Sequence, residues 1–552
     1  MAQGQGLGSV RGAFACLAIT GFAACGGGGS STDGGSGYVQ GSDVPASDAA
    51  AARFLTQATF GPTRDDIELL RFIGYAAWFD DQRAKKVSKE RPYVNALEDS
   101  GKDLNQTHRM QIWWDNAMTG GDQLRQRVAW ALSQIFVISD QHSALSGDVK
   151  GLCEYYDILS RDAFGNYRQL VEDVTLSPAM GKYLNMLRNE KADPTYNIRP
   201  DENYAREILQ LFSIGLVQLD VDGTPLQDGL GNTIPTYDQS VVEGFAATFT
   251  GWTFESSVNW WDWEGNTKPM VNWPDYHETA AKTILDGVLI PAGQTGDEDL
   301  ALALDTIFAH PNVGPFVSKL LIQRLITSNP TPAYVARVAA VFADDGTGER
   351  GDLFEVTKAI LMDDEARNGY LTMPDTFGKV KEPLLRQLGL WRALDAKAAS
   401  GKYKVYWPEW YFGQAPLRSP TVFNFYSPTF SPPGDLADNG LVAPELQIAT
   451  HSLIAEGTNE FYNLVFWGHS DNTNADKDTV KIDLKPLKPL AADPATLIDP
   501  LNVLLMGGTM SSEMNQVLLD HLNATPITDG GTQRVLEAVY LIVTSPEGAV
   551  QK

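Results

Sequence analysis

Basic residues are scarce in this chain of 552 residues. Its 43 Lys and Arg residues are outnumbered by 69 Asp and Glu residues, which gives a net charge of −26. Because nucleic-acid binding depends on a concentrated basic surface, this balance argues against nucleic acid as a partner. Hydrophobic residues make up 43% of the chain and aromatic residues 10%. We therefore expect a globular protein with a large buried core.

The short motifs of several common enzyme classes are absent as well. The chain has no H-E-x-x-H zinc motif, no C-x-x-C pair, no G-x-S-x-G turn and no P-loop. Any active site must therefore be assembled from residues that are distant in the sequence. We predict neither a metal site nor a cofactor.

Residues 1–24 are typical of a signal peptide. Arg11 provides a small basic region, residues 13–24 form an apolar stretch, and small residues precede Cys25. The apolar stretch is too short to span a bilayer. The sequence FAAC at 22–25 resembles the lipobox of bacterial lipoproteins, in which the cysteine is acylated and becomes the mature N-terminus. An ordinary cleaved export signal is the alternative.

Cysteine is rare, and its positions bear on where the protein is found. Cys16 would leave with the signal peptide and Cys25 would be acylated, so that only Cys153 remains and no intramolecular disulfide can form. Residues 25–44 are rich in Gly and Ser and predict a flexible tether. The lipoprotein resemblance, with Gly26 after the cysteine, implies the outer membrane. We expect an exported protein of the cell envelope, either an outer-membrane lipoprotein or a periplasmic protein, that contacts membrane only through a lipid anchor.

Residues 45–552 are expected to form a mainly α, multi-helical single large domain with a short β-hairpin and long aromatic-rich loops. The clearest pattern lies in residues 199–252. Apolar residues at helical spacing predict a helix over 201–215, Asp222-Gly223 predicts a hairpin turn, and Thr236-x-x-Gln239 predicts the cap of a second helix.

Helical periodicity recurs along most of the remaining chain. Thr63-x-x-Asp66 predicts a helix start and Gly74 its stop. Further apolar stripes at helical spacing predict helices over 104–118, 123–138, 147–164, 167–176, 179–187, 313–326, 332–342, 353–361, 383–394, 501–505, 512–522 and 532–544.

Several ordered segments resemble one bacterial protein family. They include AARFLTQATFGPTRDDI at 51–67, TLSPAMGKYLNM at 175–186, ENYAREILQLFSIGL at 202–216 and SPTVFNFYSPTFSPPG at 419–434. The chain resembles Domain of Unknown Function 1800. The resemblance implies a mainly helical exported protein of unknown activity. It also implies a possible partner from Domain of Unknown Function 1501, which is similar to the alkaline-phosphatase and sulfatase fold.

The candidate catalytic residues are Glu202, Arg206, Glu207, Glu243 and His277. Paired carboxylates can act as general acid and base, or as oxygen ligands for a cation, if the fold brings them together. The structural alternative is a buried ion-pair network in which Arg206 neutralises Glu202. His310, which precedes a predicted helix start, is expected to have a capping role.

Two loops carry unusually many tryptophans. The first contains Trp260, Trp261 and Trp263, and the second contains Trp407 and Trp410. Flat aromatic faces can stack on sugar rings, which makes these tryptophans candidate ligand-binding residues. The alternative is that they bury their large apolar area within the loops.

Two functions remain open from the sequence. The first is a non-catalytic envelope protein that binds or assembles with a partner. The second is an enzyme or binding protein that acts on polysaccharide through the tryptophan-rich loops and the glutamate cluster.

Overall fold

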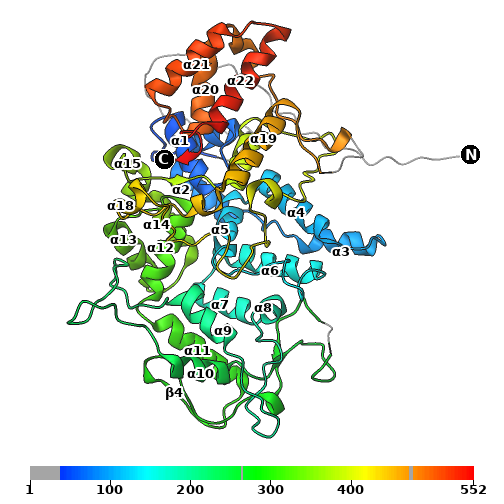
Figure 1. The fold of residues 1–552 in the computed structure, drawn as a ribbon, viewed down its shortest axis with the longest axis vertical. Coiled ribbons are helices and arrows are strands. Elements are labelled where there is room, and N and C mark those ends of the chain that lie inside the picture. The colour runs from blue at the N-terminus through cyan, green and yellow to red at the C-terminus, as the bar shows by residue number, and fades with distance from the viewer. Residues whose placement is uncertain (1–37, 263–264, 472–475) are drawn as a thin grey trace, which may run out of the picture. The chain divides into compact units, whose positions relative to one another are not determined.

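Helices provide most of the regular structure, as the sequence predicts (Figure 1). The computed structural model describes residues 38–262, 265–471 and 476–552. The predicted signal peptide at 1–24, Cys25 and most of the predicted tether at 25–44 lie outside the described residues. From Gln40 to Lys552 the chain forms one compact unit, which confirms the predicted mainly α, single large domain.

The first half of the domain contains ten α-helices. They are α1 (Asp48–Ala58), α2 (Arg64–Ala84), α3 (Arg91–Asp99), α4 (Gln106–Thr119), α5 (Gln123–Ser133), α6 (Val149–Asp162), α7 (Tyr167–Thr175), α8 (Pro178–Tyr183), α9 (Asn203–Glu207) and α10 (Gln239–Thr248) within the described residues.

The second half of the described chain is equally helical. Its α-helices are α11 (Gly296–Ala309), α12 (Val313–Leu325), α13 (Pro332–Ala343), α14 (Leu353–Met362), α15 (Asp364–Thr372), α16 (Pro383–Ala393), α17 (Glu409–Phe412), α18 (Asp435–Asp438), α19 (His451–Phe466), α20 (Pro494–Met506), α21 (Ser512–Ala524) and α22 (Thr532–Thr544).

In the described ranges, strands occur as three antiparallel pairs, and each strand is two residues long. Strand β1 (Trp252–Thr253) pairs with β2 (Val271–Asn272), β3 (Lys282–Thr283) with β4 (Leu289–Ile290), and β5 (Lys379–Val380) with β6 (Val550–Gln551). The last pair aligns Lys379 with Gln551 and so joins the C-terminal residues to the segment that precedes α16.

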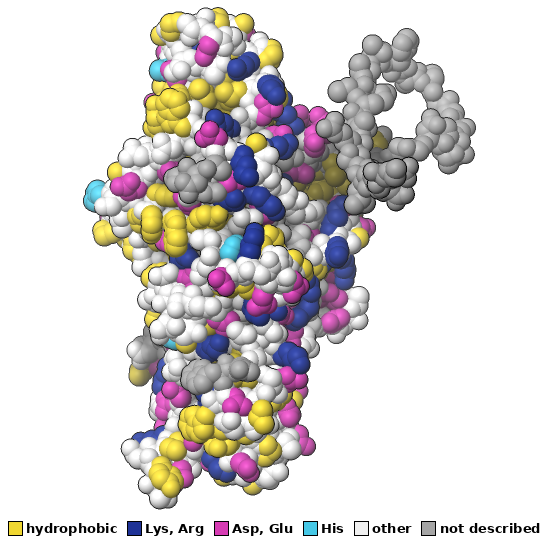
Figure 2. Space-filling model, turned by 90° about the vertical axis from the view of Figure 1, so that its right-hand side faces the viewer, with side chains coloured by type: hydrophobic (Ala, Val, Ile, Leu, Met, Phe, Trp, Pro, Cys, Tyr) yellow, Lys and Arg dark blue, Asp and Glu magenta, His cyan; other side chains and the backbone are white. Residues whose placement is uncertain are grey.

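Helix α5 lies at the centre of the domain. All of its residues are buried, and α1, α2, α4, α6 and α12 pack against it. At one end of the domain α20, α21 and α22 pack together and onto α19 and α1, while α10 and α11 lie at the opposite end (Figure 1). On the face shown in Figure 2, acidic and basic side chains are interspersed, and hydrophobic side chains form separate patches.

Local capping explains where α2 begins and why it bends. The Thr63 hydroxyl accepts a hydrogen bond from the Asp66 backbone N–H, and the Thr63 N–H donates to the Asp66 carboxylate, which confirms the predicted start. The predicted stop at Gly74 is confirmed, although a second helical segment follows it directly and the two together make up α2. Gly74 adopts a left-handed φ of 81° within the helix, and the Asp43 carboxylate accepts a hydrogen bond from the Ala76 N–H, so a new helical segment starts there.

The helix predicted over 201–215 is shorter and less regular than expected. Helix α9 ends at Glu207, and a π-helix, η1 (Ile208–Ser213), continues from it. A π-turn adds one residue to the turn and so shifts the side chains that follow it, which leaves Leu209 rather than Leu211 buried. A pattern read with regular helical spacing could not reveal that shift.

The hairpin that follows η1 is confirmed, but the predicted cap of the next helix is wrong. Gly223 N–H donates to the Asp220 carbonyl at the predicted turn, and single bridges join Val217 to Pro235 and Leu219 to Pro225. Asp238, not Thr236, caps α10, since its carboxylate accepts from the backbone N–H groups of residues 240 and 241. The Thr236 hydroxyl instead donates to a carbonyl oxygen of the preceding segment.

A fully buried carboxylate joins segments that are far apart in the sequence. Glu382 Oε2 accepts hydrogen bonds from Trp130 Nε1 at 2.9 Å, Gln134 Nε2 at 3.0 Å and Gln414 Nε2 at 2.7 Å. Lys379 Nζ lies 3.8 Å from the other Glu382 oxygen and 3.0 Å from Glu445 Oε1. This polar centre connects α5, β5, the start of α16 and the loop after α17.

Replacing Glu382 by Ala should lower the free energy of unfolding by about 3–5 kcal/mol, because it leaves three buried donors without their acceptor and removes one of the two carboxylates near the buried Lys379. The half-exposed Glu202 is the matched control, and its Ala variant should lose at most about 1 kcal/mol. Urea denaturation of the three proteins measures the difference. Similar losses in both variants would contradict the central role of Glu382.

Candidate functional site

A polar cleft of about 630 Å³ lies beside the first tryptophan-rich loop. Its walls come from the segment after α5, from α8 and the residues that follow it, from the segment before α9, and from the loop after β1. The lining residues are His142, Ala144, Gly181, Lys182, Asn185, Leu187, Arg188, Asn189, Glu190, Ile198, Arg199, Asp201 and Trp261.

The wall after α8 has an unusual backbone. Asn185 and Arg188 line the cleft with left-handed φ angles of 62° and 61°. Side chains other than glycine rarely adopt this conformation, and such positions cluster at binding and catalytic sites. Asn189 fixes the neighbouring wall, because its side chain donates to the Asp201 carbonyl and accepts from the Asp201 N–H, at 3.1 and 2.7 Å.

Charges of both signs face the cleft. Lys182 Nζ forms an ion pair with Asp148 at 2.6 Å, and the Arg188 guanidinium donates to the Asp262 carbonyl. Arg199 is exposed and, within the described residues, has no hydrogen-bond or ion-pair partner. The cleft therefore offers a mixture of donors and acceptors, with one guanidinium that is available to a ligand.

Two adjacent tryptophans have opposite environments. Trp260 is buried, stacks on Tyr276 with ring centroids 3.9 Å apart, and donates from its indole N–H to Glu190 at 2.8 Å. Trp261 is 65% exposed and lines the cleft. Trp263 lies outside the described residues.

The second tryptophan-rich loop lies apart from the cleft lining. Trp407 and Trp410 stack with ring centroids 5.3 Å apart and planes 11° from parallel. The Arg418 guanidinium lies over the Trp407 ring, and Trp410 is 67% exposed.

The expected ion pair between Glu202 and Arg206 is present, with 2.7 Å between the charged groups. Gln239 on α10 hydrogen-bonds to both side chains, at 2.9 Å to Glu202 and 3.1 Å to Arg206. The pair is half-exposed, however, so the expected buried network is a surface network. Glu243 is exposed and accepts only a long hydrogen bond from Gln239, at 3.4 Å. None of these residues lines the cleft.

Glu207 differs from the other acidic candidates. It is buried at the junction of α9 with the π-helix, and its Oε2 atom has no hydrogen-bond partner among the described residues. Burial raises the pKa of Glu207, and the nearby Arg206 partly offsets that effect. A protonatable carboxyl therefore lies where α9 passes into the π-helix.

His277 belongs to the core and does not line the cleft. Its ring nitrogens lie 3.0 Å from the Thr250 carbonyl oxygen and 3.0 Å from Asp299 Oδ2, and Lys282 also binds Asp299. His310 has the expected capping contact, because its Nδ1 atom accepts a hydrogen bond from the Asn312 N–H at 3.1 Å. In the described ranges, no group of three or more His, Cys, Asp or Glu side chains is arranged to hold a metal ion.

Sequence reasoning found Trp261 but missed most of the cleft. Lys182, Asn185, Arg188 and Asn189 follow one another closely at the end of α8, within and just after a segment that carries the family resemblance. The sequence signal that could have identified the cleft was the alternation of cationic and amide side chains in this run. Cys153, the described cysteine, is a buried free thiol whose pKa burial raises well above its ordinary value.

None of the helices in the described ranges is both long and apolar enough to span a bilayer.

Replacing Glu207 by Gln should stabilise the protein at neutral pH. Because the folded-state pKa is raised above the ordinary value of 4.5, ionisation is unfavourable in the folded protein, and stability is lost as pH rises through that range. The stability gain of the variant should be small near about pH 4 and larger near about pH 7. Urea unfolding across this range measures it. A less stable variant at neutral pH would show instead that Glu207 has a stabilising cationic partner.

Comparison with known proteins identifies the family but no characterised relative. A family model described as "Protein of unknown function (DUF1800)" matches residues 53–550, which include the whole cleft lining. No curated protein and no solved structure gives a match. The match covers nearly the whole chain and confirms the resemblance seen in the sequence. The protein therefore belongs to the DUF1800 family.

Proposed function

We propose that this protein binds saccharides at the cell envelope and that the cleft beside Trp261 is its binding site. The observation that carries the proposal is the exposed Trp261 side chain at a cleft lined by amides, carboxylates and guanidinium groups. The export signal and lipid anchor expected from residues 1–25 are part of the proposal, since they would bring the cleft to envelope polysaccharide.

The chemistry of the lining suits a ligand with many hydroxyl groups. A sugar presents an apolar face to an aromatic ring and hydroxyls that both donate and accept hydrogen bonds. The Asn185 amide can both donate and accept hydrogen bonds, and Arg199 adds a donor that has no partner among the described residues. The cleft volume lies within the usual range for small-molecule sites.

The glutamates that the sequence suggested as catalytic residues do not support hydrolysis at this cleft. Hydrolysis of a glycosidic bond requires two carboxyl groups on either side of the scissile bond. Glu202, Glu207 and Glu243 do not line the cleft. Of the carboxylates that do, Glu190 accepts from Trp260, and Asp201 accepts from the Asn203 N–H and the Asn185 amide.

Replacing Trp261 by Ala should weaken saccharide binding about tenfold, which corresponds to about 1.4 kcal/mol, because the stacking surface is lost. Trp410 is the matched control, since it is equally exposed but lies outside the cleft lining. A glycan array selects the ligand, and titration calorimetry on the best oligosaccharide measures both variants.

The proposal fails if the wild-type protein binds no glycan above background. It also fails if the Trp261 and Trp410 variants lose affinity equally.

The hairpin at 216–236 supports a second candidate function, which is docking of a protein partner. Its side chains Leu216, Val221, Leu226 and Leu230 are exposed apolar residues. Exposed apolar groups gathered on one short segment are typical of an interaction surface. The candidate partner is a protein of Domain of Unknown Function 1501.

Changing Val221 and Leu230 together to Asp should abolish co-purification of a partner from native membranes, because the charges would have to be buried at the interface. Ile527→Asp is the control, since Ile527 is also exposed but lies near the C-terminus. Mass spectrometry of the affinity-purified proteins reads out the result. Equal recovery of the same partner with both variants would rule out the hairpin as the docking surface.

A further inference from the structure

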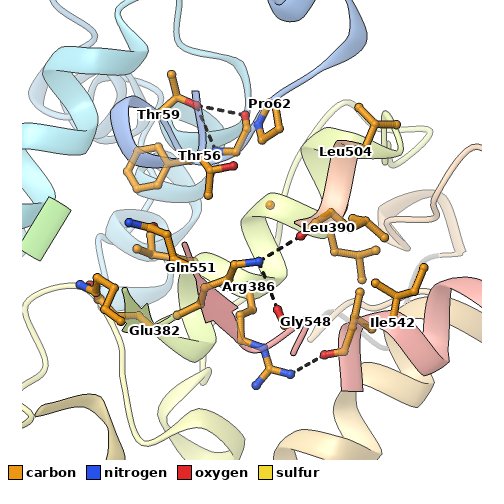
Figure 3. A pocket seen from close by; sticks show the side chains of 18 residues that line it. Thr56, Thr59, Pro62, Glu382, Arg386, Leu390, Leu504, Ile542, Gly548 and Gln551 are labelled. Carbon is orange, nitrogen blue, oxygen red and sulfur yellow. Dashed lines mark hydrogen bonds and ion pairs between the residues drawn. The ribbon is translucent and has the colours of Figure 1, made fainter. Parts of the chain in front are cut away.

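Two cationic side chains lie between a small interior cavity and an apolar groove. Lys381 precedes α16 and Arg386 is within it, and both line each of the two hollows. The cavity has a volume of about 50 Å³ and the groove about 370 Å³. Figure 3 shows the cavity, with Thr59 and Pro62 on one side and Arg386, Ile542 and Gly548 on the other.

Neither cation has an acidic partner among the described residues. Lys381 Nζ donates to the carbonyl oxygens of Leu505 and Gly548, at 3.0 and 3.1 Å. Arg386 donates to the Val543 carbonyl, its guanidinium lies 4.6 Å from the centre of the Phe461 ring, and its Nε–H is buried without an acceptor. Within the part of the chain that the structure describes, these two positive charges therefore contact neutral carbonyls and a ring.

The acidic side chains that line the two hollows are engaged elsewhere. Glu445 forms its ion pair with Lys379 at 3.0 Å, and Glu382 accepts three hydrogen bonds from α5 and the loop after α17. Burial and the neighbouring Arg386 charge lower the pKa of Lys381 to about 7, and burial lowers the pKa of Arg386 to about 10. Two desolvated like charges without a counter-ion are costly, and a bound anion would offset that cost.

The groove itself is mainly apolar. Leu453, Ile454 and Phe461 of α19 form one wall, and residues around the end of α22 face them. Ile454 is 54% exposed, so this wall borders solvent. The interior cavity has room for little more than a water molecule or two, whereas the groove has the volume of a small-molecule site.

We propose that the groove binds a long-chain fatty acid. Its alkyl chain lies along the apolar wall of α19, and its carboxylate pairs with Lys381 and Arg386. The choice of ligand follows from charge complementarity, because the site combines two cations lacking an acidic partner with an apolar surface leading away from them. Such a site fits a molecule with one anionic end and one apolar tail. This site is separate from the saccharide cleft, and the two proposals fail independently.

Titration calorimetry of the full-length protein with laurate tests the head and tail requirements. Laurate should bind at least about tenfold more tightly than butyrate, which has the same head and a short tail. Laurate should also bind more tightly than dodecyl maltoside, which has the same tail and an uncharged head. Dodecyl maltoside is used below its critical micelle concentration. No laurate binding, or equal affinity for either comparison ligand, would overturn the proposal.

Substitutions in the groove then test where laurate binds. Lys381→Met and Ile454→Glu should each weaken laurate binding at least about tenfold, the first by removing the cation and the second by placing a negative charge in the groove. Lys319→Met is the matched control, because Lys319 lines another apolar hollow and has no ion pair within the described residues.

Thermal melting monitors folding of each variant, and the half-exposed position of Ile454 keeps the test valid if the Lys381 variant unfolds. Wild-type affinity in a folded Lys381→Met or Ile454→Glu protein would refute the assignment. An equal loss in the Lys319 variant would also refute it.

Discussion

The hydrogen bonds to Glu382 are the constraint on which the rest of the domain depends. A carboxylate removed from water is tolerated only when donors surround it, and here the donors come from α5 and from the loop after α17, on either side of α16 in the sequence. The three hydrogen bonds tie the start of α16 to α5 and to the loop after α17 at one position. Because α5 is buried along its whole length, these bonds also position the helices packed around it.

Most helices could be predicted because their signals are local. The apolar stripe of α22 gave both ends of that helix as the structure has them, and the Thr63 capping pair gave the start of α2. Other outcomes depended on distant residues. The stop at Gly74 was predicted, but the helical segment that starts again after it was not, because its cap is the distant carboxylate of Asp43. No helix was predicted over α19, because its buried stripe includes Gly457 and Glu460 while its apolar Ile454 is exposed.

The cleft shows why site prediction was harder than helix prediction. Trp260 and Trp261 are identical in sequence terms, yet Tyr276 and Glu190 cover one and leave the other exposed. Glu202 and Arg206 were linked correctly because residues four apart meet on a helix, whatever the tertiary fold. The left-handed residues Asn185 and Arg188 could not be foreseen, since a chain reveals a strained backbone only through the contacts that hold it.

The pairing of β5 with β6 ties the last residues of the chain to two distant segments. Thr56 and Pro62 line the same cavity as Gly548 and Gln551. Gln551 also donates hydrogen bonds to the carbonyls of Leu325 and Ile326 at the end of α12. Removal of the last few residues would therefore leave the carbonyls of two buried residues without donors and take away the strand partner of Lys379.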